Sequence, residues 1–112
     1  MNKVVHLTSV HRRYDARIFL KMCVSLAEAH YETHLVVADS LGDENKYGVL
    51  IHDVKKEQGR LNRVIKTSKK IFDKAIQLNA SIYHIHDPEL IPIGLKLKRQ
   101  GKKVIFDAHE DF

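Results

Sequence analysis

Short β-type segments alternate with amphipathic segments along the chain, and this alternation limits the folds that the sequence can adopt. Strands are predicted at residues 3–9, 32–39, 47–54, 81–87 and 102–108. Helices are predicted at residues 16–29, 59–79 and 88–100, where apolar residues recur three and four positions apart. Strands joined by helices form right-handed βαβ units with a mostly parallel sheet. The sequence therefore predicts an α/β protein.

The expected architecture is a Rossmann-like three-layer αβα sandwich with a mostly parallel five-stranded sheet in the order 3-2-1-4-5. A chain of 112 residues is expected to form one domain over residues 1–112. In such a sheet, ligands bind beyond the carboxyl ends of the strands, where the strand order reverses. Three loops are predicted to meet at that edge, at residues 9–15, 87–89 and 109–111. Most of the chemically reactive side chains lie in these loops.

Local signals predict how the helices begin and end. Asp15 and Asp87 stand where N-cap residues are expected, and Pro88 suits a first helical turn. Gly101 suits the position after the last helix. The second helix is predicted to bury one stripe of side chains, which consists of Leu61, Val64, Ile65, Ser68, Ile71, Phe72, Ala75 and Ile76.

Composition narrows the range of function classes. The apolar runs are too short to cross a bilayer, and the segment after Met1 is strand-like rather than an apolar export signal. Cys23 is the only cysteine, so an intrachain disulfide is excluded. We expect a small buried core residue at this position, with a reactive thiol as the alternative. These features are typical of a protein of the reducing cytoplasm.

The net charge of +5 is concentrated in two basic segments. The first carries a single acidic residue, Asp73, among Arg60, Arg63, Lys66, Lys69, Lys70 and Lys74. The second, which has no acidic member, contains Lys96, Lys98, Arg99, Lys102 and Lys103. Such patches favour phosphate, anionic lipid or nucleic acid, or they form a solvated helix face. No aromatic interleaving or known motif favours nucleic acid as a partner.

The loop "HRRYDAR" (11–17) contains no glycine, which argues against a dinucleotide site of the G-x-G-x-x-G type. Its three arginines, Arg12, Arg13 and Arg17, stand beside the start of a helix. Guanidinium groups and helix N–H groups together suit a phosphate or another anion. The alternative is a set of surface arginines beside a capping Asp15.

Histidines mark the ends of the last two predicted strands. His84 and His86 lie on one face of a strand, and His109 and Glu110 follow the neighbouring strand. Zinc needs three or four converging ligands. We predict no metal site here and favour a hydrogen-bonded buried histidine at position 84. His109 lies among carboxylates that raise its pKa, and it could bind a substrate hydroxyl or act as an acid or base.

Two stretches, "DARIFLKMCVSLAEAHYETHLVV" and "IYHIHDPELIPIGLKLKRQGKKVIFDAHEDF", resemble the N-terminal domain of a family 4 glycosyltransferase with the GT-B fold. The resemblance covers essentially the whole chain. It implies two Rossmann-like domains that face each other across a cleft. The N-terminal domain would bind the acceptor, and the C-terminal domain would bind the nucleotide-sugar donor. It also implies retention at the anomeric carbon and no obligatory metal.

The resemblance assigns roles to several residues. His109 would hydrogen-bond the donor sugar as the catalytic group. Asp15, Arg17, Asp87 and Glu110 would line the cleft or brace its loops. Arg12 is also predicted to bind the substrate, because its loop is rich in arginine. A glycine that ends the first helix in the family's "A-E-A-G-Y" is His30 here, where a positive φ would cost about 1 kcal/mol.

The donor domain's acidic motif lies beyond residue 112, so the chain by itself is expected to be inactive. No cofactor is expected, because the nucleotide sugar would bind mainly to the missing domain. The implied acceptor is a glycan or a lipid-linked glycan of cell-surface polysaccharide synthesis. The basic residues between 60 and 74 would contact an anionic cytoplasmic membrane. An uncovered interdomain face could support a homodimer. The alternative function is a stand-alone binding or regulatory module for a phosphorylated ligand.

Overall fold

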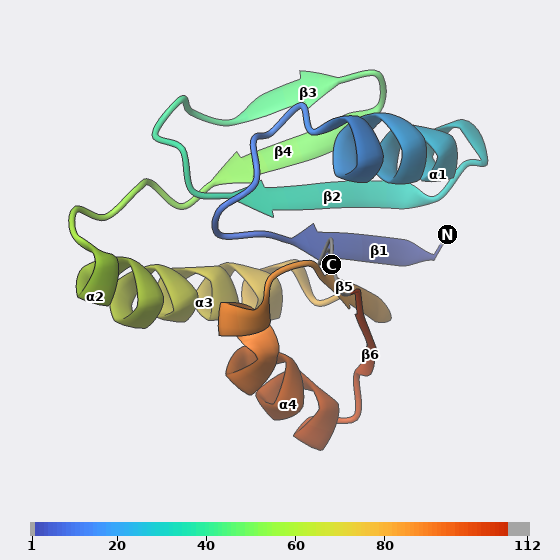
Figure 1. Ribbon diagram of the computed structural model, residues 1–112. Coiled ribbons are helices and arrows are strands. Elements are labelled where there is room, and N and C mark those ends of the chain that lie inside the picture. Colours follow the sequence, from blue (N-terminus) through green and yellow to red (C-terminus); the bar gives the residue numbers. More distant parts are fainter. Residues whose placement is uncertain (1, 108–112) are drawn as a thin grey trace, which may run out of the picture.

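The computed structural model describes residues 2–107, which form a six-stranded sheet in the order β3-β4-β2-β1-β5-β6 (Figure 1). The strands are β1 (Lys3–Leu7), β2 (Glu32–Val37), β3 (Glu44–Lys46), β4 (Val49–Asp53), β5 (Ile82–Ile85) and β6 (Lys103–Phe106). All neighbouring pairs are parallel except β3 with β4. The predicted α/β class is confirmed, and the five predicted strands occur in the predicted order.

The sixth strand, β3, was not predicted from the sequence. It forms an antiparallel hairpin with β4 in which Lys46 pairs with Val49, so Tyr47 and Gly48 make a two-residue turn. Both turn residues have positive φ, 52° for Tyr47 and 83° for Gly48. A type I′ hairpin turn requires positive φ at both central residues. Asn-Gly and Asp-Gly indicate such a turn in a sequence more clearly than Tyr-Gly does. The prediction of one strand over 47–54 therefore merged the turn with β4.

Helices cover both faces of the sheet and complete the three layers (Figure 1). On one face lie η1 (Ala16–Cys23), a π-helical segment, and α1 (Val24–Glu28). On the other face lie α2 (Arg60–Asn62), the π-helical η2 (Arg63–Thr67), and α3 (Ser68–Leu78). The 3₁₀ turn η3 (Pro88–Leu90) and α4 (Ile91–Arg99) share that second face. No helix within residues 2–107 is long and apolar enough to cross a membrane.

Two apolar clusters hold the layers together. Ile18, Phe19 and Cys23 of η1 pack on Leu35 and Ile51 of the sheet, and all five are at most 1% exposed. The second cluster lies between the other sheet face and the helices and contains Val5, Leu7, Tyr83, Ile85, Ile71 and Leu97. Burial raises the pKa of the Cys23 thiol to about 12. Cys23 is thus the core residue that we predicted.

Most predicted helix ends are confirmed. The Asp15 carboxylate caps η1 by accepting hydrogen bonds from Arg17 N and Ile18 N, each at 2.9 Å. His30 follows α1 with a φ of 70°, the strained left-handed region expected for this position. Gly101 has a φ of 84°. Asp87 stands at the predicted N-cap position of η3, but its side chain makes no capping hydrogen bond and turns to the first loop instead.

The predicted buried stripe of the second helix is wrong in its first half. Leu61 and Ile65 are 72% and 60% exposed, whereas Thr67 is fully buried. A π turn holds more residues than an α turn, so η2 rotates the preceding residues away from the sheet. From Ser68 onward the α-helical spacing returns, and Ile71 and Ala75 are buried as predicted.

Candidate functional site

Two loops meet at the carboxyl end of β1. The Asp87 carboxylate, which follows β5, accepts hydrogen bonds from Thr8 Oγ1 at 2.6 Å and from Ser9 N at 2.7 Å. Its other oxygen lies 2.7 Å from His11 Nδ1. The predicted meeting of loops 9–15 and 87–89 is therefore confirmed. Asp87 is 3% exposed, so its contacts brace these loops.

Glu89 extends this contact to the long helix. Its carboxylate accepts a hydrogen bond from Ser9 Oγ at 2.7 Å and pairs with Arg63 of η2 at 3.1 Å. Sequence reasoning assigned no role to Glu89. The signal was its position two residues after Asp87, which itself lies two residues beyond the end of the β1–β5 pair. Glu89 thus fixes the distance between the β1 loop and η2.

A cavity of about 250 Å³ opens between these elements. Its polar lining consists of Ser9, His11, Arg12, Asp39, Lys56, Arg63 and Thr67. Thr67 is fully buried, and its Oγ1 has no hydrogen-bond partner within residues 2–107. Arg63 Nε is likewise buried without one in that range. Of the predicted site residues, Arg12 reaches this cavity, which offers three cationic side chains and unused donors.

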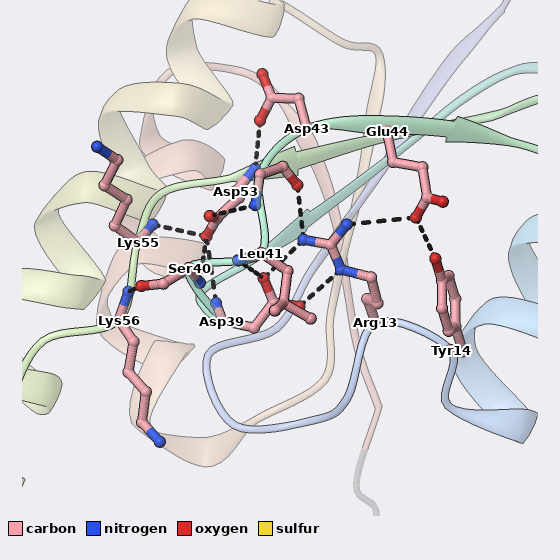
Figure 2. A network of polar contacts seen from close by, with 11 residues as sticks. Arg13, Tyr14, Asp39, Ser40, Leu41, Asp43, Glu44, Asp53, Lys55 and Lys56 are labelled. Carbon is pink, nitrogen blue, oxygen red and sulfur yellow. Dashed lines mark hydrogen bonds and ion pairs between the residues drawn. The ribbon is translucent and has the colours of Figure 1, made fainter.

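Arg13 holds the cavity wall in place through the loop after β2 (Figure 2). Its Nε and one terminal nitrogen donate to the two Asp39 oxygens, each at 2.7 Å. It also donates to Gly42 O at 2.7 Å and pairs with Glu44 at 3.3 Å. The hydrogen bonds from Arg13 lower the pKa of Asp39. Arg13 is 5% exposed, so this arginine is a structural brace rather than a free anion ligand.

Asp53 at the end of β4 fixes the same loop. Its carboxylate accepts hydrogen bonds from the backbone N–H groups of Asp39, Ser40, Gly42 and Lys55, at 2.8 to 3.2 Å (Figure 2). Burial raises the pKa of Asp53, but these four bonds outweigh it and lower the pKa. The loop therefore has a defined shape beside the cavity. An Asp at the end of a strand gave no specific sequence signal for this role.

The other predicted site residues do not line this cavity or lie outside the described range. Arg17 projects from η1 and pairs with Asp107 at 2.9 Å, and its side chain is 50% exposed. Asp15 is used as the cap of η1. His109 and Glu110 lie outside the described residues, as does Asp111 of the same predicted loop. Their predicted roles stay predictions.

Three histidines gather between β1 and the end of β5. His6 pairs in register with His84, and His86 lies two positions further on the same sheet face. His6 Nδ1 lies 2.8 Å from His86 Nε2, and the three rings stack with centroids 4.4 to 5.0 Å apart. Burial, and then the nearby His84, lower the pKa of His6 to about 3. The shared face of His84 and His86 was predicted, but the participation of His6 required the strand register.

No protein-family model matches the chain, and no curated protein or solved structure gives a significant match.

Proposed function

We propose that this chain is the acceptor-binding N-terminal domain of a retaining GT-B glycosyltransferase. The enzyme would move a sugar from a nucleotide-sugar donor to a glycan or lipid-linked acceptor, in the synthesis of cell-surface polysaccharide. The observation that carries the proposal is the polar cavity beside the carboxyl ends of β1 and β2, whose walls Asp87, Glu89 and Asp53 brace. Ligands of open α/β sheets bind at this edge. The sequence resemblance described above supplies the reaction class.

The size and lining of the cavity define what part of an acceptor it could hold. Its volume of about 250 Å³ lies below the range of roughly 300–1,000 Å³ that is typical for drug-sized ligands. It suits one sugar unit or one phosphate group rather than a whole lipid-linked glycan. Arg12, Lys56 and Arg63 favour an anionic group, while Ser9 offers a hydroxyl to a sugar.

Binding by the chain itself tests the acceptor role. Backbone amide spectra would be followed while short glycans, glycosyl phosphates, inorganic phosphate and nucleotide sugars are added separately. We expect the glycan-containing acceptors to shift amides around Ser9, Arg12 and Thr67, and nucleotide sugars to bind more weakly. Arg12→Ala should weaken acceptor binding about tenfold, the effect of losing one hydrogen bond to a charged group. Lys69→Ala, which alters a residue outside this cavity, is the matched control.

The same titration separates the proposal from its alternative. The three cationic side chains of the cavity also suit a stand-alone module for a phosphorylated ligand. If inorganic phosphate binds as tightly as glycosyl phosphate and no neutral glycan binds, the module is the better description. If neither glycan nor glycosyl phosphate shifts the cavity amides, the acceptor role is wrong.

The proposal includes contact with the anionic inner face of the cell membrane through the basic residues between 60 and 74. Arg63 and Lys70 pair with Glu89 and Glu57, so they are partly neutralised. Three cations of this segment make no ion pair within residues 2–107: Arg60 and Lys66, which are exposed, and Lys74, which is partly buried. Each basic residue near an anionic bilayer contributes on the order of 1 kcal/mol.

Replacing Arg60, Lys66 and Lys74 together with alanine should therefore reduce co-sedimentation with anionic liposomes at least roughly tenfold. A variant that loses three charges elsewhere, at Lys98, Lys102 and Lys103, is the matched control and should lose less. Equal binding of the wild type to neutral and anionic vesicles would exclude this membrane contact.

A further inference from the structure

We propose that His6, His84 and His86 form a binding site for a divalent zinc-class cation between β1 and the end of β5. Each ring can offer one nitrogen as a ligand, and the three ligand atoms lie within 4.8 Å of one another. Imidazole is a preferred ligand of zinc, which takes three or four ligands in tetrahedral geometry. This site is separate from the polar cavity and does not depend on the proposed glycosyltransferase function.

The three ligand atoms lie within 4.8 Å of one another, so they would move a short way to reach the spacing that zinc requires. Ligands at 2.0–2.1 Å from a tetrahedral ion are about 3.3 Å apart. His6 Nδ1 and His86 Nε2 are already 2.8 Å apart. The rings stack with interplanar angles of 13° to 28°, so the rings must turn about their χ2 angles to aim their lone pairs at one point. Histidine χ2 is a soft torsion, and such a turn leaves the backbone in place.

The surroundings keep the ligands ready for a cation. His6 is 1% exposed and His86 is fully buried, so a bound ion would be shielded from water. The ligands also come from two paired strands, which fix their spacing.

Asp107 supplies the outer part of the site. Its Oδ2 lies 3.3 Å from His84 Nε2, and its Oδ1 pairs with Arg17 at 2.9 Å. A carboxylate beside a ligand histidine commonly fixes its tautomer and orientation. A bound ion would therefore connect β1, β5 and, through Asp107 and Arg17, the start of η1. Its role would be to stabilise the sheet edge.

Metal titration of the chelator-treated chain tests the proposal. Zn²⁺ binding would be measured by calorimetry, and Co²⁺ binding by its visible absorption in a nitrogen-rich site. We expect one ion per chain, and His84→Gln should weaken binding at least about tenfold. His52→Gln is the matched control, because His52 lies in a second stacked pair with His34, 2.8 Å apart, outside the three-histidine cluster. It should keep the wild-type affinity.

X-ray absorption at the zinc edge of the wild type gives a second readout that needs no variant to fold. Three imidazole ligands and an unchanged affinity in His52→Gln support the site. The proposal is overturned if the wild type binds no ion, if fewer than two imidazoles are counted, or if a folded His84→Gln binds as the wild type does. In that case the three histidines are a hydrogen-bonded part of the core.

Discussion

Replacing Arg13 with alanine is expected to lower the free energy of unfolding by about 3 kcal/mol. Arg13 makes two hydrogen bonds to Asp39 at 2.7 Å, one to Gly42 O at 2.7 Å, and an ion pair with Glu44. Its side chain is 6% exposed, and that of Asp39 is 21% exposed. Removing the guanidinium leaves the Asp39 carboxylate and the Gly42 carbonyl without this donor. Urea denaturation at pH 7 measures the loss.

The pH dependence of this loss identifies its cause. Hydrogen bonds from Arg13 lower the pKa of Asp39 below its ordinary value of 3.8. A lowered carboxylate pKa gives stability that is present above the ordinary value and is lost as the pH falls through the folded-state pKa. The difference between wild type and Arg13→Ala should therefore be constant from pH 5 to 7 and should shrink below about 3.8.

Lys69→Ala is the control for removal of a charge. Lys69 pairs with Asp73 at 3.4 Å, but the two side chains are 78% and 62% exposed. The variant should lose no more than about 0.5 kcal/mol. A loss below about 1 kcal/mol for Arg13→Ala would contradict the view that Arg13 braces the wall of the cavity.

The parallel part of the sheet could be predicted because its signals are local and repeated. Apolar residues at Ile18, Phe19 and Cys23 mark one helix face, and all three are buried as expected. The hairpin of β3 could not be predicted, because its turn needs a positive φ at Tyr47 and tyrosine is not a residue type that indicates such a turn. The prediction of which residues the second helix buries was also wrong in part. Its π turn depends on tertiary contacts rather than on apolar spacing, and only Ile71 and Ala75 of the predicted stripe are buried.

The site was predictable in its location but not in its connections. Parallel strands place their carboxyl ends at one edge, so the approach of Ser9 to Asp87 followed from the strand order. The pairing of Arg13 with Asp39 joins residues 26 positions apart and depends on the shape of an irregular loop. His6 entered the histidine cluster because the β1–β5 register sets it opposite His84. The register between β1 and β5 cannot be read from a single sequence.

The second large effect is expected at His109, which lies outside the described residues. The resemblance to family 4 glycosyltransferases implies that this histidine hydrogen-bonds the donor sugar in the closed cleft. A positioned acid, base or hydrogen-bonding group contributes roughly 100-fold or more to the rate. His109→Ala should therefore lower turnover by at least about 100-fold, with acceptor affinity nearly unchanged, because the resemblance assigns this histidine to the donor sugar.

Nucleotide release by the product of the complete reading frame, as wild type and as His109→Ala, tests the central claim most directly. A panel of nucleotide sugars would be offered with a glycan acceptor, and the 112-residue chain would be assayed in parallel. We expect turnover by the wild-type product, turnover lowered about 100-fold or more in the variant, and no turnover by the isolated chain. Turnover that is equal in wild type and variant, or absent with every donor, would contradict it.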